Sequence, residues 1–153
     1  EMCRVGIAVD VAHLNDAGID DVLGIANRPV FASHSNARAV TPHPRCLMDE
    51  HIKAIAKQGG VIGVNFYYKQ LTGNKSAVVE DVIRHIDHIA AVGGIGCTAI
   101  GSDFDGMGLY IEGLETSAGL PLIAERLLRL NYSEADVRRI MFDNLYGYIL
   151  EFC

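Results

Sequence analysis

Apolar residues gather in four short, nearly unbroken runs, and a helical pattern follows each of them. The runs cover residues 5–11, 30–33, 61–66 and 97–101. They lack the alternation of apolar and polar residues, which is typical of strands buried on both faces, as in a parallel sheet. A repeated strand-helix order predicts an α/β fold with parallel strands and right-handed crossovers.

Helical spacing of apolar residues separates these runs, and most of the predicted helices begin at a capping residue. The clearest is the stripe from Val78 to Ala90, which recurs every three or four residues. The helices are expected after Asn15 or Asp16 up to Pro29, from Met48 or Asp49 to Gly59–Gly60, from Ser76 to Gly93–Gly94, from about Leu120 to Leu130, and from Ser133 to about Leu150.

The length and the repeat spacing together predict one domain. The chain has 153 residues, 50% of them apolar, which is enough for a single buried core. His13 and Asp103 end the first and fourth runs and lie 90 residues apart, an average of 30 per unit. That spacing is close to a unit of an eight-unit barrel. Residues 1–153 are therefore predicted to form four parallel β-α units, half of a (β/α)8 TIM-type barrel.

Charge and cysteine content narrow the classes of partner. The net charge is −6, and the lysines and arginines are scattered. This pattern lacks the basic patch that nucleic-acid binding needs. The four cysteines include no Cys-x-x-Cys pair, so free thiols in a reducing, cytoplasmic compartment are expected. Cys46 is either a reactive thiol or, as is commoner for a lone cysteine, a packing residue.

Each apolar run ends in a polar side chain: His13, His34, Asn65 and Asp103. The carboxyl ends of parallel strands share one rim, where such folds keep their chemistry. Two imidazoles from neighbouring strands can bind one cation, and neutral imidazole suits zinc. The alternative is a pair of hydrogen-bonding histidines at a sheet edge. Catalytic zinc usually takes about three protein ligands, so His13 and His34 alone are too few.

Asp103 and Arg45 are the other candidates on this rim. The Asp103 carboxylate can carry a proton from a metal-bound water to a leaving group, or ligate the metal itself. Its alternative role is to cap a turn, which suits Asp105 better. The planar guanidinium of Arg45 suits a carboxylate, such as the C-terminal end of a small peptide. Without its neighbours it would be interpreted as a surface arginine.

The remaining histidines are predicted to have no chemical role. His85 and His88 flank an apolar helical stripe and are interpreted as structural, whereas His43 and His51 are expected to be solvated.

Several segments, taken together and in order from Met2 to about Leu150, resemble the membrane dipeptidase family, also called renal dipeptidase, of the zinc-dependent amidohydrolase superfamily. They are VDVAH, PVFASHSNAR followed by HPR, GGVIGVNFY, HIDHI, IGSDFDG and LLRLNYSEADVRRIMFDN. The resemblance implies a (β/α)8 barrel with a dinuclear zinc site that hydrolyses dipeptides.

The resemblance also implies roles for four residues. His13 and His34 would ligate one of the two zinc ions, Arg45 would bind the substrate carboxylate, and Asp103 would serve in acid/base chemistry. The family's His-x-Asp, bridging carboxylate and further histidine have no counterpart, because the sequence begins at what would be the fifth strand. Smaller departures are Cys46, the Met141–Phe142 pair and the GLETSAGLPL stretch, which are expected to alter packing.

The chain is therefore expected to be the C-terminal half of a dipeptidase barrel, about strands 5 to 8, and to be inactive alone. Its expected partners are a dipeptide substrate and an N-terminal half, a companion chain or a second copy. One alternative is a catalytically incomplete fragment that acts as a metal-binding or interaction module. Another is a complete open-sheet enzyme of different chemistry, which would need a full ligand set within these 153 residues.

Overall fold

The computed structural model describes residues 1–152, so Cys153 lies outside the described residues. In chain order the elements are the 3-10 turn η1 (Met2–Val5), α1 (Asp16–Ile25), α2 (Asp49–Lys57), β1 (Ile62–Asn65), α3 (Tyr68–Thr72), α4 (Val79–Gly93), η2 (Ile95–Cys97), β2 (Thr98–Ser102), η3 (Ser117–Gly119), α5 (Leu120–Arg129), α6 (Glu134–Arg138), the π-helical turn η4 (Arg139–Asp143) and α7 (Asn144–Phe152). Within residues 1–152 no helix has both the length and the apolar character to cross a membrane.

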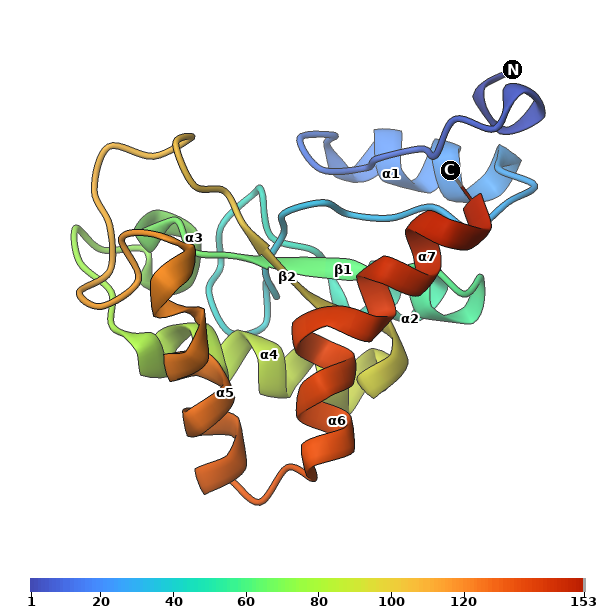
Figure 1. Ribbon diagram of the computed structural model, residues 1–153. Helices are drawn as coiled ribbons and strands as arrows, with labels where there is room; N and C mark the ends of the chain where they lie inside the picture. Colours follow the sequence, from blue (N-terminus) through green and yellow to red (C-terminus); the bar gives the residue numbers. More distant parts are fainter. Residues whose placement is uncertain (153) are drawn as a thin grey trace.

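The centre of the fold is a parallel strand pair, which confirms the α/β class (Figure 1). In β1 and β2, Ile62 pairs with Thr98. Single parallel bridges join Asp10 to Phe31 and Ala32 to Ile62. The four segments predicted as strands therefore lie side by side in chain order, with the same direction.

The prediction of full strands at residues 5–11 and 30–33 is wrong, because each makes only isolated bridges. The ladder begins normally, since the Val11 amide donates to the Phe31 carbonyl at 2.9 Å. The next donor, the Ser33 amide, binds the Asp10 carboxylate at 2.9 Å. The Asp10 side chain thus takes a donor that would otherwise continue the backbone ladder, and the pairing stops there.

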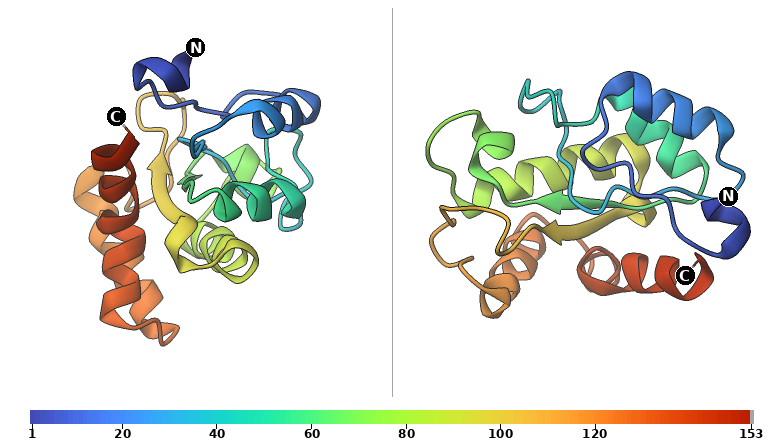
Figure 2. Two further views of the ribbon diagram at one scale, coloured as in Figure 1. Left: turned by 90° about the vertical axis from the view of Figure 1, so that its right-hand side faces the viewer. Right: turned by 90° about the horizontal axis from the view of Figure 1, so that it is seen from above.

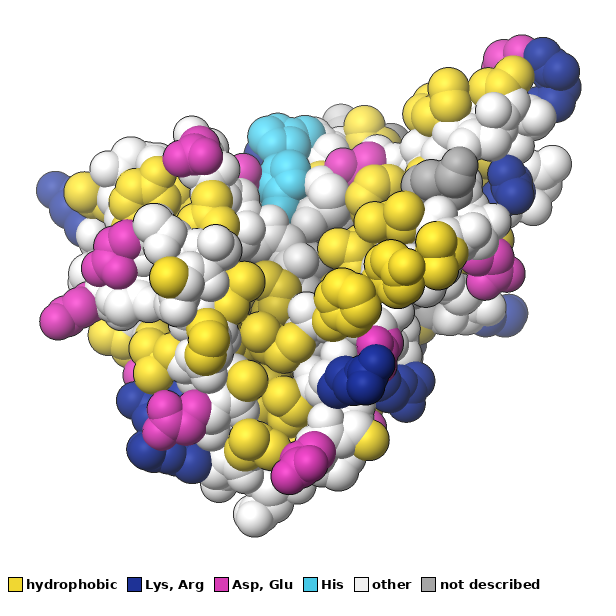
Figure 3. Space-filling model, in the orientation of Figure 1, with side chains coloured by type: hydrophobic (Ala, Val, Ile, Leu, Met, Phe, Trp, Pro, Cys, Tyr) yellow, Lys and Arg dark blue, Asp and Glu magenta, His cyan; other side chains and the backbone are white. Residues whose placement is uncertain are grey.

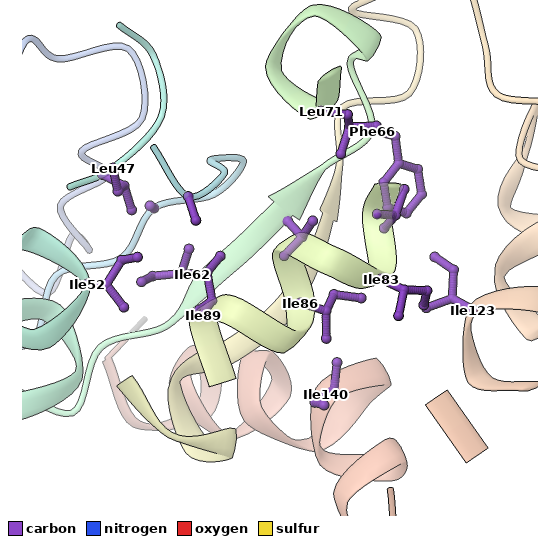
Figure 4. Close-up of a cluster of buried hydrophobic side chains, with 14 of the residues drawn as sticks. Leu47, Ile52, Ile62, Phe66, Leu71, Ile83, Ile86, Ile89, Ile123 and Ile140 are labelled. Atoms are coloured by element: carbon purple, nitrogen blue, oxygen red, sulfur yellow. The ribbon is translucent and has the colours of Figure 1, made fainter. Parts of the chain in front are cut away.

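Helices pack against one another and cover the sheet (Figure 2). α1 packs on α2, α2 on α4, and α4 on both strands and on α5. Figure 4 shows the core between them, where Ile62 of β1 lies near Ile52 of α2 and Ile89 of α4. Each such isoleucine contributes roughly 1.5–3 kcal/mol when fully buried. This apolar layer holds the strand ends at fixed positions.

The capping residues were predicted correctly at two helices and wrongly at one. The Asn15 side chain accepts the Gly18 amide, and the Ser133 hydroxyl accepts the Asp136 amide. Ser76 does not cap α4, which begins at Val79. Asp81 reaches back instead, and its carboxylate accepts the Val78 amide at 2.8 Å. An acidic residue at the third helical position satisfies a free amide in the same way as a capping box.

Two further helical details differ from the prediction. Between the apolar run at residues 61–66 and the helix predicted from Ser76 lies a short helix, α3, that the sequence pattern did not predict. The last predicted helix is interrupted by the π-helical turn η4, which divides it into α6 and α7.

Two histidines tie helices together through carboxylates. His51, predicted to be solvated, is buried, and its Nε2 donates to Asp20 of α1 at 3.1 Å. That prediction was wrong because α1 covers this side of α2. His88 of α4 donates to Asp49 of α2 at 2.8 Å, a structural contact as expected.

His85 joins α4 to the segment that follows His34. Its ring is 0% exposed. The Ala37 amide donates to His85 Nδ1 at 3.1 Å, and His85 Nε2 donates to the Leu71 carbonyl at 3.0 Å. Burial lowers the pKa of His85 to about 4. The ring is therefore neutral at physiological pH and bridges two backbone groups.

We predict that His85 makes stability fall on acidification. The unfolded chain binds a proton near pH 6.5 and the folded chain only near pH 4, so stability is lost as the pH falls below 6.5. Between pH 6.5 and 5 this loss amounts to roughly 1.5 kcal/mol of unfolding free energy. Urea unfolding at several pH values should show that His85→Gln removes this component. The control is His88→Gln, at a histidine whose side chain is 26% exposed. Parallel pH curves for His85→Gln and the parent would contradict the prediction.

Candidate functional site

Two of the predicted site residues, His13 and His34, meet at the end of the sheet. Their Nε2 atoms lie 2.9 Å apart. The rings cross edge to face, with centroids 5.0 Å apart. Figure 3 shows histidine side chains grouped at the surface above the sheet. Their parent segments are bridged at Asp10 and Phe31, so neighbouring strand ends deliver the two rings to one point, as the sequence predicted.

Hydrogen bonds orient both rings. Arg45 Nη1 lies 2.8 Å from His13 Nδ1, and a guanidinium can only donate, so this nitrogen accepts. His13 Nε2 then carries the ring proton and donates to His34 Nε2. The Ser33 hydroxyl lies 2.7 Å from His34 Nδ1, which donates to it. The rings therefore form a directed chain from Arg45 to Ser33.

The surroundings of His13 favour its neutral form. Desolvation, followed by the Arg45 guanidinium and the His34 ring, lowers the pKa of His13, while Asp103 and Asp10 raise it by smaller amounts. These carboxylates are therefore close enough to act on the ring. A neutral imidazole is the form that binds a metal ion.

The pair fits part of a metal coordination shell. No group of three or more His, Cys, Asp and Glu residues within residues 1–152 is arranged to hold a metal ion. Two converging imidazoles nevertheless match two positions of a tetrahedral zinc site. His34 has the usual arrangement of a ligating histidine, whose other nitrogen is hydrogen-bonded. Ligation through His13 Nε2 requires the proton on Nδ1, so Arg45 Nη1 has to turn away from the ring.

Arg45 presents an unused edge of its guanidinium. Its Nε and Nη2 atoms are buried and have no hydrogen-bond partner in the part of the chain that the structure describes. An unpaired buried donor costs about 1–3 kcal/mol, more when charged, so such a pair calls for a ligand. Nε and Nη2 lie along one side of the planar group and match the two oxygens of a carboxylate. The structure thus brings Arg45 to the histidines with two buried guanidinium donors that have no partner among residues 1–152.

In contrast to Arg45, Arg38 has hydrogen-bond partners for its guanidinium and a structural role, which the sequence did not reveal. Its guanidinium makes two hydrogen bonds to Asp16, at 2.7 and 2.8 Å, and others to the Cys46 and Pro44 carbonyls. The Arg38 guanidinium lowers the pKa of the Asp16 carboxyl. Arg38 therefore ties the start of α1 to the segment that carries Arg45. Only the position of Asp16 in the first turn of a helix hinted at such a partner.

Asp103 follows β2 in a left-handed backbone conformation, with φ 70°, and Ser102 before it has φ 32°. Such conformations are costly for residues other than glycine and gather at functional sites. The buried Asn65 donates from Nδ2 to Asp103 Oδ2 at 3.1 Å. Asp103 Oδ1 has no hydrogen-bond partner among residues 1–152, and it lies so close to Gly106 that a Cβ at that position would collide with it. One carboxylate oxygen is held and the other is available.

Cys46 is a packing residue, and the reactive alternative is wrong. The side chain is 1% exposed, and its thiol donates to the Gln70 carbonyl. Burial raises the pKa of the Cys46 thiol to about 12, so the thiolate needed for reaction is absent at neutral pH.

The other departures from the family pattern differ in their burial. Met141 packs against the core. Phe142 is exposed and stacks on Tyr146, with the ring centroids 4.9 Å apart. In the GLETSAGLPL stretch, Leu114 is buried.

The comparisons with known proteins agree with this geometry. The family model of membrane dipeptidase, peptidase family M19, matches residues 1–148. Dipeptidase AC, a solved metallo peptidase of family M19, is 37% identical with a TM-score of 0.92, over 99% of this chain and 45% of its own. A Rhodobacter sphaeroides metallo peptidase, crystallised with a phosphinate mimic of the dipeptide L-Ala-D-Ala, is 33% identical with a TM-score of 0.92, over 99% and 44%.

A Pseudomonas aeruginosa amidohydrolase is 26% identical with a TM-score of 0.89, over 99% of this chain and 54% of its own. The chain thus spans about half the length of the solved structures that it matches.

Proposed function

Because this chain belongs to the membrane dipeptidase family, peptidase family M19, we propose that it supplies one half of the active site of a zinc-dependent dipeptidase. The observation that carries the proposal is the pair of buried, unpartnered donors, Nε and Nη2 of Arg45, beside two converging imidazoles. A carboxylate receptor next to a metal site suits a substrate whose scissile bond lies one residue from its free carboxylate.

Each residue has a separate task in this proposal. His13 and His34 hold one of two zinc ions. When bound, zinc supplies a Lewis acid for the scissile carbonyl and lowers the pKa of water. Arg45 binds the C-terminal carboxylate of the dipeptide through Nε and Nη2 and so sets the position of the amide. Asp103 moves a proton to the leaving amine with the oxygen that Asn65 does not hold.

The rest of the site has to come from outside residues 1–152, since two imidazoles are fewer than the roughly three protein ligands of a catalytic zinc. We propose that the four parallel segments correspond to about strands 5 to 8 of a (β/α)8 barrel. The coverage of about half of each solved relative supports this arrangement. The remaining ligands would lie in the other half of a longer chain, in a companion chain or in a second copy.

We expect the full-length gene product to release free amino acids from L-Ala-D-Ala or L-Ala-L-Ala in the presence of zinc. The 153-residue chain alone should release none, because its ligand set is partial. The two preparations are compared by chromatography of the products. Hydrolysis by the chain alone would refute the shared site. Zinc uptake without hydrolysis by the full-length product would favour the second candidate, a non-catalytic metal-binding module.

The metal assignment predicts a loss of bound zinc in His34→Ala. The full-length variant should retain at least one zinc fewer per chain after dialysis, measured by inductively coupled plasma mass spectrometry. His88→Ala is the matched control, because His88 binds Asp49 away from the rim and should leave the zinc content unchanged. Equal zinc in both variants would remove His34 from the ligand set.

Arg45→Lys should weaken substrate binding, because an ammonium cannot match two carboxylate oxygens. Loss of the paired charge-assisted hydrogen bonds should raise KM about 10–100-fold with little change in kcat. The variant should also lose the parent's preference for a dipeptide over its C-terminal amide. Steady-state kinetics on both substrates measure this.

Arg38→Lys is the control for Arg45→Lys. It removes a guanidinium from the same short segment that already has its partners, so it should lower Tm without raising KM. A KM for Arg45→Lys within twofold of the parent would contradict carboxylate binding by Arg45.

A further inference from the structure

We infer that Asn65 is a positioning residue that holds the Asp103 carboxylate for proton transfer; this inference rests on the proposed dipeptidase function. Asn65 ends β1 and is 0% exposed, while Asp103 directly follows β2. The Asn65 Nδ2 group donates to Asp103 Oδ2 at 3.1 Å. This is the hydrogen bond that the Asp103 side chain makes within residues 1–152.

The orientation of the Asn65 amide is fixed by the backbone that follows it. The Tyr67 amide can only donate, and it lies 2.5 Å from Asn65 Oδ1. The opposite end of the amide, Nδ2, therefore faces Asp103. With these two partners the side chain presents a donor, and not an acceptor, to the carboxylate.

A second amide, Asn36, holds the backbone of Asn65. The backbone amide of Asn65 donates to Asn36 Oδ1 at 3.0 Å, and Asn36 Nδ2 donates to the backbone carbonyl of Asn65 at 3.1 Å. Asn36 is also 0% exposed and lies two residues after His34. This pair of hydrogen bonds resembles one step of a parallel ladder. It connects the turn that carries His34 to the carboxylate after β2.

Asp103 needs such support because its backbone is strained. Both Ser102 and Asp103 have positive φ, which side chains other than glycine rarely adopt. The pairing of β1 and β2 also shifts register between Val64 and Asn65, so that Asn65 lies opposite Ser102. Irregular strand pairing of this kind redirects side chains near active sites. The Asn65 hydrogen bond fixes Oδ2 and leaves Oδ1 for the proton.

A purely structural role for Asn65 is the competing explanation, and Asn144 provides the comparison. Asn144 Nδ2 donates to the Ile95 and Thr98 carbonyls, at 2.6 and 2.8 Å, at the opposite end of β2. It is thus an amide that supports the same strand without contacting the site. Asn144→Asp should lower Tm and leave kcat and KM close to those of the parent.

The test is a double-mutant cycle in the zinc-loaded, full-length gene product, with L-Ala-D-Ala as substrate. The variants are Asn65→Asp, Asp103→Asn and the double variant, each measured for kcat, KM and Tm. Asn65→Asp keeps the size of the side chain but replaces the donor with an acceptor. We expect its kcat to fall 10–100-fold with KM within about twofold, the range seen when residues that orient a reactive group are changed.

The double variant distinguishes a positioning role of Asn65 from a purely structural role. If Asn65 acts through Asp103, removing it after the carboxylate is gone should cost no further kcat, so the two losses should not add. Additive losses, or an unchanged kcat in Asn65→Asp, would overturn the inference. Should Asn65→Asp fold poorly, Asn65→Ser gives the second measurement, and the same loss confined to kcat is expected. Absence of hydrolysis by the parent would instead refute the proposed function.

Discussion

The structure depends on how the backbone amides at the ends of the parallel segments find hydrogen-bond partners. At this rim the backbone ladder stops, and side chains take over. The Asp10 carboxylate accepts the Ala12 and Ser33 amides, and His85 accepts the Ala37 amide. A buried amide without a partner costs about as much as a lost hydrogen bond, so these side chains determine where each segment leaves the sheet.

The same hydrogen bonds from backbone amides to side chains also position the functional groups. Because Asp10 ends the first ladder, the chain turns sharply and His13 adopts φ 75°. Because Ser33 is held, its hydroxyl lies beside His34 and orients that ring. Positive φ at His13 and Asp103 is unfavourable in isolation, and it persists only where the surrounding structure holds the backbone in place. The strain and the candidate chemistry coincide at one rim of the sheet.

Arg45 and Arg38 show that the role of an arginine depends on the hydrogen-bond partners of its guanidinium and not on its residue type alone. Both are arginines of one short segment, and both lie partly buried. Arg38 has its partners, including the Asp16 carboxylate, and is part of the scaffold. Arg45 has one hydrogen bond to His13 and two buried donors without partners among residues 1–152. That difference is electrostatic and geometric. The sequence pointed to Arg45 through its predicted place on the rim and its HPR segment, but it did not reveal the partners that separate Arg45 from Arg38.

The sequence by itself determined the order of elements and the convergence of His13 and His34, because apolar runs and helical spacing are local patterns and parallel strand ends share one rim. The tertiary structure decided what depends on distant neighbours. It shortened the first two strands through Asp10, buried His51 beneath α1, and made Cys46 inert by covering it. It also joined Asn36, Asn65 and Asp103, which lie 29 and 38 residues apart along the chain. Such partners meet only when the chain has folded, since their hydrogen bonds join segments that lie far apart along the sequence.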